Sequence, residues 1–275
     1  MLSKHKITLK QRIVSKLENN YLFVIGWLIV GTVAIGITLS TPVSWLAIKY
    51  KETLGNIPMQ YKKLESLSAN VHISNFVNAL GNPAIVNSIE KESLKDYVFV
   101  NKYYYVDVLT NEDGKVLSFA VTARDKQFKP AFELPPISEN GKPLKITLNV
   151  STLGDISPLI EEGYGGSTHP TCTTMFGVRR FWYFEGLYDG NPDNYQSVYY
   201  GINDAGYLDM DLISDLANKI GSMSSDCRDV PNEFRNGVRV NTFMITAPFE
   251  FMALESSKAA QIKFGVDSDE VRVIK

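Results

Sequence analysis

The chain has 275 residues and a nearly balanced charge, with 28 Lys and Arg against 30 Asp and Glu. Seven of these basic residues and one acid precede position 52, so residues 52–275 carry 21 basic and 29 acidic side chains and a net charge of −8. This acidic balance argues against nucleic acid as a partner and against a basic lipid-binding surface. Abundant Val, Ile, Phe and Tyr argue against disorder.

Residues 19–48 contain no charged side chain. A helix needs about 20 mostly apolar residues to cross the hydrocarbon core of a bilayer. Tyr21 and Trp45 are placed as interfacial aromatics, and Pro42 comes where a span ends or kinks. A cleaved signal peptide has a shorter apolar core, and a buried core helix is usually shorter and more polar. The sequence therefore predicts an uncleaved transmembrane helix over 21–48.

Basic residues flank the predicted span, five before it and four after it. This distribution favours a cytoplasmic N-terminus, with residues 1–20 as a basic cytoplasmic tail. We therefore expect a single-pass protein of the bacterial inner (plasma) membrane, with the lipid bilayer as a partner and the soluble part in the periplasm. A soluble part that faces the cytoplasm is the alternative.

The soluble part is predicted to be α+β, with helices and antiparallel sheet in two small subdomains over 52–128 and 146–275. Apolar residues three and four apart predict a helix over 52–80 that breaks at Pro58 and stops at Gly81. Aromatic and β-branched runs predict strands over 96–100, 103–109 and 115–122, with Gly114 in the hairpin turn. Four prolines mark residues 129–145 as a connector between the two subdomains.

The second half shows the same kinds of signal. A helix is predicted before Gly221, over 209–220. The predicted strands are 146–150, 180–188, 196–202, 238–247, 261–266 and 270–274.

One segment resembles a known family. Phe76-Val77-Asn78-Ala79-Leu80-Gly81-Asn82-Pro83, Tyr103-Tyr104-Tyr105-Val106 and Asp113-Gly114-Lys115-Val116 are similar to a helix, a stop and a hairpin of the small lipoprotein module of the outer-membrane barrel-assembly machinery. The resemblance covers residues 66–122 and lacks the lipidated Cys of that family. It implies an α+β scaffold that binds partners without catalysis, and suggests the class of single-pass bacterial membrane proteins.

Two residues could support chemistry near position 170. His169 and Cys172 follow a Gly-rich loop, and a Cys nucleophile needs a base within reach. A loop His beside a structural Cys is the simpler interpretation. Cys172 and Cys227 can pair if they face an oxidising compartment, the alternative being two buried free thiols.

A second set of candidates opens like a calcium loop, with Asp189, Asn191 and Asp193. The Gly and Glu that an EF-hand needs at its sixth and twelfth positions are replaced by Asn194 and Tyr200. These residues are therefore expected to form an Asx-rich surface turn, with a non-EF calcium clip left open.

Together, these observations predict a membrane-anchored, non-catalytic binding or assembly module of the bacterial envelope, with another protein as its partner. We predict no cofactor, no resident metal and no enzymatic activity. The alternatives are a cytoplasm-facing membrane sensor or effector, for instance in phage defence, and a hydrolase that uses Cys172.

Overall fold

A computed structural model describes residues 56–89, 93–134, 143–159, 171–177, 180–189, 196–208, 232–248 and 263–272. The chain divides into two compact units, Met1–Gln60 and Tyr61–Lys275. Of the first unit, the structure describes only the first half of helix α2 (Asn56–Glu65), where Gln60 Nε2 donates to Asn56 Oδ1 at 2.7 Å. All that follows concerns the second unit.

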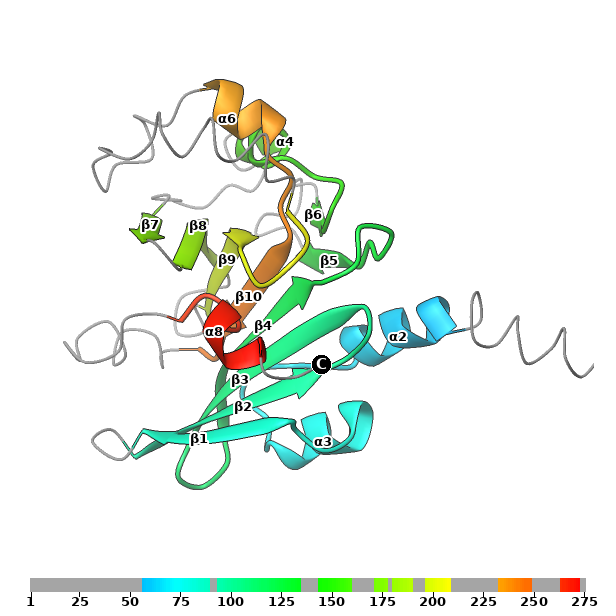
Figure 1. The fold of residues 1–275 in the computed structure, drawn as a ribbon, viewed down its shortest axis with the longest axis vertical. Coiled ribbons are helices and arrows are strands. Elements are labelled where there is room, and N and C mark those ends of the chain that lie inside the picture. The colour runs from blue at the N-terminus through cyan, green and yellow to red at the C-terminus, as the bar shows by residue number, and fades with distance from the viewer. Residues whose placement is uncertain are drawn as a thin grey trace, which may run out of the picture. The chain divides into compact units, whose positions relative to one another are not determined.

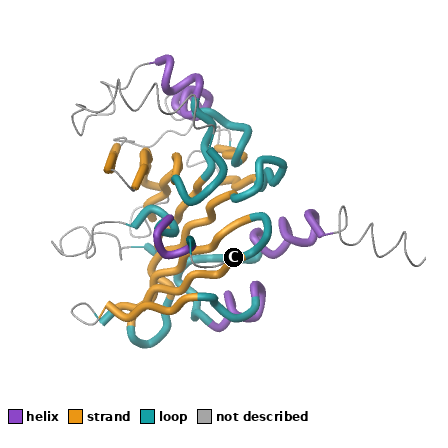
Figure 2. Tube along the Cα trace, viewed as in Figure 1, coloured by secondary structure: helices purple, strands orange, loops and turns teal. Residues whose placement is uncertain are grey.

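One eight-stranded antiparallel sheet organises this unit, as Figures 1 and 2 show. Its centre is the pairing of β4 with β10, which joins strands from early and late parts of the chain. In order across the sheet, the strands are β1 (Ile85–Ile89), β2 (Leu94–Val100), β3 (Tyr104–Asn111), β4 (Val116–Ala123), β10 (Thr242–Thr246), β9 (Gln196–Asn203), β8 (Arg180–Asp189) and β7 (Thr171–Gly177).

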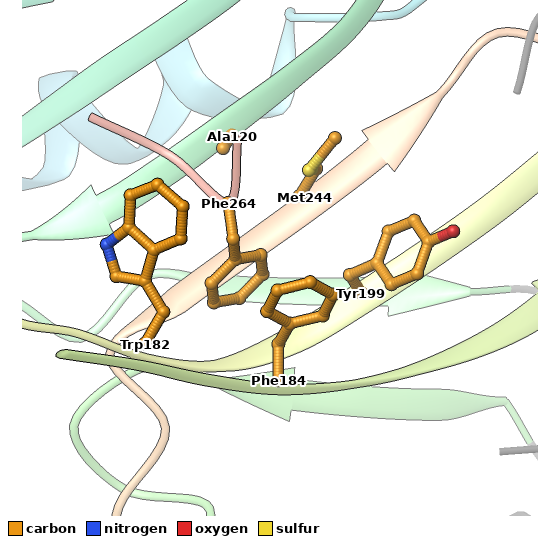
Figure 3. Packing of buried hydrophobic residues seen from close by; sticks show 6 residues of the cluster. All are labelled: Ala120, Trp182, Phe184, Tyr199, Met244 and Phe264. Carbon is orange, nitrogen blue, oxygen red and sulfur yellow. The ribbon is translucent and has the colours of Figure 1, made fainter. Parts of the chain in front are cut away.

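The last described segment, residues 263–272, covers one face of the sheet, which we call the C-terminal face. Phe264 stacks on Phe184 of β8, with ring centroids 4.5 Å apart. Figure 3 shows the cluster that these rings form with residues of β4, β8, β9 and β10: Ala120, Trp182, Tyr199 and Met244. Further along the segment, Val266 and Val271 pack against Val98 and Tyr105.

Short helices and a two-stranded ribbon cover the opposite face, which we call the helical face. The ring of Phe76 in α3 (Ser74–Leu80) packs edge-on against the ring of Phe119, with centroids 5.3 Å apart. The ring of Phe132 in β5 (Ala131–Leu134) stacks on that of Phe243, with centroids 4.2 Å apart. Strand β5 pairs with β6 (Leu144–Thr147), and α4 (Leu153–Leu159) follows. Phe234 of α6 (Asn232–Gly237) packs edge-on against Tyr183 at 4.9 Å. Aromatic contacts thus fix the layers on both faces.

The predicted fold class is wrong in two respects. The unit is sheet-rich, and its described helices have between four and ten residues. A single sheet also takes strands from both predicted subdomains, because β4 pairs with β10 over five residues. The predicted connector contains the ribbon strand β5 and the start of β6, which pair with each other.

The predicted membrane anchor is also corrected. Within the described part of the chain, no helix is long and apolar enough to cross a membrane. The predicted span, 21–48, and the tail, 1–20, lie outside the described residues. The single-pass, inner-membrane localisation and the signal-anchor assignment are therefore not supported.

The helix predicted over 52–80 is two helices, and the break comes after Pro58. Pro58 lies in the first turn of α2, where its missing N–H costs nothing. Helix α2 ends at Glu65, and residues 70–73 between the two helices pair with the start of β4: the N–H of Val116 donates to Val71 O at 2.8 Å, and His72 bridges Lys115. Gly81 ends α3 with a φ of 94°, as its sequence position predicts.

The end of the described chain differs from its prediction. The strands predicted over 261–266 and 270–274 are not formed where the chain is described; residues 263–266 are irregular, and Ser268–Val271 is helix α8. Asp267 and Glu270 form a capping box, the signature of a helix start. The predicted helix over 209–220 lies outside the described residues.

Candidate binding site at a sheet edge

Strand β1 is the outermost strand on one side of the sheet, and its only strand partner among the described segments is β2 (Figure 1). Sheet edges usually carry a charge, a Pro or a bulge that blocks pairing with another chain. Strand β1 reads Ile-Val-Asn-Ser-Ile, and its register with β2 runs through five residues without a shift. Val86 is 52% exposed and Ile89 is 39% exposed. This edge is therefore open and apolar.

The register assigns the residues of β1 to the two faces of the sheet, because successive side chains of a strand point to opposite faces. Ile85, Asn87 and Ile89 lie on the C-terminal face, opposite Val98, Asp96 and Leu94. Val86 and Ser88 lie on the helical face, opposite Tyr97 and Lys95. A strand added beside β1 would therefore meet apolar side chains on both faces.

A cluster of charged side chains on the C-terminal face adjoins β1. Lys263 Nζ lies 2.6 Å from Asp96 Oδ2, 3.3 Å from Asp107 Oδ2 and 2.8 Å from Glu270 Oε2. Both aspartates are buried strand residues. The Asn87 side chain donates to Glu270 Oε1 at 3.2 Å. This cluster, the Lys263 cluster, ties the C-terminal segment to β1, β2 and β3.

The two aspartates of the cluster titrate in opposite directions. Burial raises the pKa of Asp107 well above its ordinary value, and the charge of Asp96 adds to the rise while Lys263 opposes it. Burial also acts to raise the pKa of Asp96, but the hydrogen bond with Asp107 and the Lys263 ammonium bring it below its ordinary value. Of the two carboxyls, Asp107 therefore takes up a proton the more readily, and Asp96 is the one that favours the charged form.

Lys263 remains charged in this environment. Burial acts to lower its pKa, but the carboxyls of Asp107 and Asp96 outweigh this effect and raise it. With the capping residues of α8, the cluster brings more acids than bases to this face beside β1. The acids are Asp96, Asp107, Asp267, Asp269 and Glu270, and the bases are Lys263 and Arg272.

A second cluster lies on the helical face under α6. Glu185 of β8 is 1% exposed. The guanidinium of Arg235 donates hydrogen bonds to both of its carboxylate oxygens, from Nη1 at 2.5 Å and from Nη2 at 3.0 Å. The hydroxyls of Tyr183 and Tyr200 donate to the same carboxylate at 2.8 Å and 3.3 Å. Four donors thus satisfy one buried carboxylate, and we call this group the Glu185 cluster.

The tyrosines of the Glu185 cluster stay protonated. Burial raises the pKa of Tyr183 and of Tyr200, and the nearby Glu185 charge raises both further. Each hydroxyl is therefore held as a donor. Because both carboxylate oxygens of Glu185 are already occupied, this arrangement anchors α6 to the sheet and leaves no lone pair directed at a substrate.

Comparisons with known proteins give little. No protein-family model matches the chain, and no curated protein matches it. One solved structure that matches is a cysteine-rich secretory protein from Staphylococcus aureus subsp. aureus Mu50, with 14% identity over 67% of this chain and a TM-score of 0.33. The match spans 46% of that protein's length. A likeness at this level carries no argument about function.

The residues that the sequence singled out fall largely outside this site. His169, Asn191, Asp193 and Cys227 lie outside the described residues. Asp189 is the last residue of β8, paired with Gln196 at the far side of the sheet from β1.

Cys172 lies in β7, where it pairs with Glu185 of β8. The loop predicted before it therefore gives way to a strand by Thr171. The predicted disulfide between Cys172 and Cys227 is not supported: Cys227 lies outside the described residues, and no disulfide is found among the residues that the structure describes. The resemblance to the barrel-assembly lipoprotein stays a prediction.

Sequence reasoning missed both charged clusters. Lys263 and Asp96 are 167 residues apart, and Arg235 and Glu185 are 50 apart. A signal was nonetheless present, because Asp96, Asp107 and Glu185 are acids within otherwise apolar or aromatic strands. A buried acid in a strand requires a partner. Among the described residues, no group of three His, Cys, Asp or Glu side chains is arranged to hold a metal ion.

Proposed function

We propose that this protein is a non-catalytic binding module that accepts an extended segment of another protein along β1. The observation that carries the proposal is the edge strand β1, whose described residues Ile85–Ile89 include no charge, no Pro and no register shift, and on which Val86 and Ile89 are exposed. An added strand gains main-chain hydrogen bonds along the edge, and its alternate side chains give specificity.

The charged clusters support a binding role because each is directed inward. Glu185 is occupied by Arg235 and two tyrosines, and Lys263 is occupied by three carboxyls. Such groups hold late segments of the chain against the sheet. The Lys263 cluster fixes the sheet beside β1, which lowers the entropic cost of binding a flexible segment.

Site-specific photo-crosslinking tests the proposal. The photoreactive residue p-benzoylphenylalanine is placed at position 86 in the full-length chain, in the cells that make it. The matched control places it at Val150, which is 47% exposed and lies in a turn away from the sheet edge. Illumination is followed by mass spectrometry of the adducts.

We expect a discrete adduct with another protein at position 86 and none of the same mass at position 150. Equal adducts at both positions, or none at position 86, would overturn the proposal. An adduct with a second copy of this chain would also contradict it, because the edge would then serve self-association.

A further inference from the structure

We infer that a basic patch at one end of the sheet binds an acidic segment of another protein. The patch consists of Lys102, Arg124 and Lys126, and we call it the basic end. It lies where β2 turns into β3 and where the chain leaves β4. The basic end contains no residue of β1, so the inference goes beyond the function proposed for that strand.

Two loops that are distant in the sequence meet at the basic end. The N–H of Arg124 donates to Tyr103 O at 2.8 Å. Its side chain reaches the same turn, because Arg124 Nη1 donates to Asn101 O at 3.4 Å. The guanidinium therefore lies beside the turn that carries Lys102.

Each cation of the basic end lies over the ring of a tyrosine. The pairs are Lys102 with Tyr103 at 5.3 Å from the ring centroid, Arg124 with Tyr105 at 5.1 Å, and Lys126 with Tyr207 at 5.5 Å. A cation within about 6 Å of an aromatic centroid is attracted to the ring. The rings therefore restrain the three charged groups without neutralising them.

The charge of the basic end is not neutralised by neighbouring acids. All three cations are exposed. Within the described part of the chain, no ion pair joins any of them to a carboxylate. Asp125 is the single acid within 101–105 and 123–128, and its Oδ1 accepts a hydrogen bond from the N–H of Gln127 at 2.8 Å. Three cations against one acid leave a local charge of +2, whereas residues 52–275 together carry −8. An anionic partner is therefore attracted to this end specifically.

The loop that carries two of the cations is fixed from the interior. Phe128 is fully buried and stacks on Tyr103 and Tyr104, with ring centroids 5.5 Å and 5.2 Å apart. The buried side chain of Asn149 donates to Asp125 O and to Phe128 O, both at 3.0 Å. The cations are thus held in place before a partner arrives, which lowers the entropic cost of binding.

The surroundings of the cations favour a protein partner over nucleic acid or a membrane. Single-stranded nucleic acid gains affinity by stacking its bases on aromatic rings, but Tyr103 and Tyr105 are each only 5% exposed. Binding in the membrane interface needs apolar side chains that insert. The exposed residues within 101–105 and 123–128 are all polar: Lys102, Arg124, Lys126 and Gln127. Carboxylates need neither stacking nor insertion, and the planar guanidinium of Arg124 suits them.

Peptide binding to the full-length chain tests the inference, with fluorescence anisotropy at low salt. The probe is a labelled peptide in which Glu alternates with Ser. The first control replaces every Glu by Gln, which keeps the length and removes the charge. An oligothymidylate of the same length and phosphatidylserine vesicles test the two other classes of anionic partner.

Two double variants locate the contact. Arg124→Gln with Lys126→Gln removes two charges of the basic end. The matched control, Lys145→Gln with Arg239→Gln, also removes one Lys and one Arg, from β6 and from the bridge to Thr152. All four positions are exposed, so thermal unfolding midpoints close to the wild-type value should show that both variants fold.

We expect the Gln peptide to bind at least about tenfold more weakly than the Glu probe. The variant of the basic end should weaken the Glu probe about three- to tenfold, and the control variant should leave it within about twofold. Absence of saturable binding of the Glu probe, or equal loss in both variants, would overturn the inference. Tighter binding of the oligonucleotide or the vesicles than of the Glu probe would also overturn it, because the partner would then belong to another class. None of these results bears on the adduct at position 86, which tests β1 separately.

Discussion

The Lys263 cluster and the Glu185 cluster join late segments of the chain to opposite faces of one sheet, but they handle buried charge differently. The Glu185 cluster pairs one carboxylate with one guanidinium and two hydroxyls. The Lys263 cluster has three carboxyls for one ammonium, and burial raises the pKa of one of them, Asp107, well above its ordinary value. The first is a closed ion pair, and the second has more carboxyls than its single ammonium can pair.

This difference matters for the edge strand. The Lys263 cluster reaches β1 through Asn87 and Glu270, whereas the Glu185 cluster is on β8, at the other side of the sheet. The Glu185 cluster serves to hold the aromatic half of the sheet under α6.

The largest effect is expected from Arg235→Met, which leaves the Glu185 carboxylate buried without its counter-ion. Removal of one partner of a buried ion pair costs about 3–5 kcal/mol. Urea denaturation should show this loss in the free energy of unfolding. The double variant Arg235→Met with Glu185→Gln should recover part of it, because no buried charge then remains. A loss below about 1 kcal/mol would mean that the two tyrosines suffice for the carboxylate.

A smaller effect is expected from Lys263→Met, because Asp107 can hold its proton when the ammonium is gone. We predict a loss of about 1–3 kcal/mol at neutral pH. The folded-state pKa of Lys263 is raised, so its contribution is complete below the ordinary lysine pKa and is lost as the pH rises through the folded value. If Lys263→Met lowers the free energy of unfolding by more than Arg235→Met does, the predicted difference between the two clusters is wrong.

A third substitution, Asp107→Asn, tests how protonation of the Asp107 carboxyl affects stability. The amide can donate to Asp96 as the protonated acid does, but it cannot ionise. The folded-state pKa of Asp107 is raised, so its stabilising contribution is full below about pH 3.9 and declines as the pH rises through the folded value.

Between the ordinary pKa of an aspartate and the raised folded-state pKa of Asp107, the Asp107→Asn variant should therefore become more stable relative to the wild type as the pH rises. The gain should approach about 1.4 kcal/mol for each pH unit between the two pKa values. Chemical denaturation of both proteins over a pH series provides the test. A difference that does not change with pH would show that Asp107 is ionised in the folded protein.

The smallest effect is expected from Asp269→Asn, at the rim of the Lys263 cluster. The Asp269–Arg272 pair is solvent-exposed, and such pairs contribute about 0–1 kcal/mol. Thermal unfolding should show a small loss that decreases further at high salt. A loss as large as that of Lys263→Met would place Asp269 inside the buried cluster.

The sequence predicted well where local signals were strong. The hairpin of β3 and β4 is confirmed, because aromatic and β-branched residues flank a turn that needs Gly114 at a positive φ, which is 78° in the structure. Strands β8 and β9 are confirmed on the same grounds. Gly81 ends α3 as predicted.

What could not be predicted depends on contacts between distant residues. Pro58 was read as a break, but α2 continues past it to Glu65, and residues 70–73 then pair with the start of β4. Strand β1 has three exposed and two half-buried residues and no turn signal that marks it as an edge. The pairing of β4 with β10 spans about half the chain, so the single sheet was read as two subdomains.

Amide hydrogen exchange of Ile85–Ile89 in the free full-length chain tests the central claim that β1 is an open edge. Only alternate amides of an edge strand bond to its single neighbour. We predict that alternate amides of β1 exchange slowly and that those between them exchange at nearly unprotected rates. Uniform protection of all five amides would contradict the account, because the edge would already be covered.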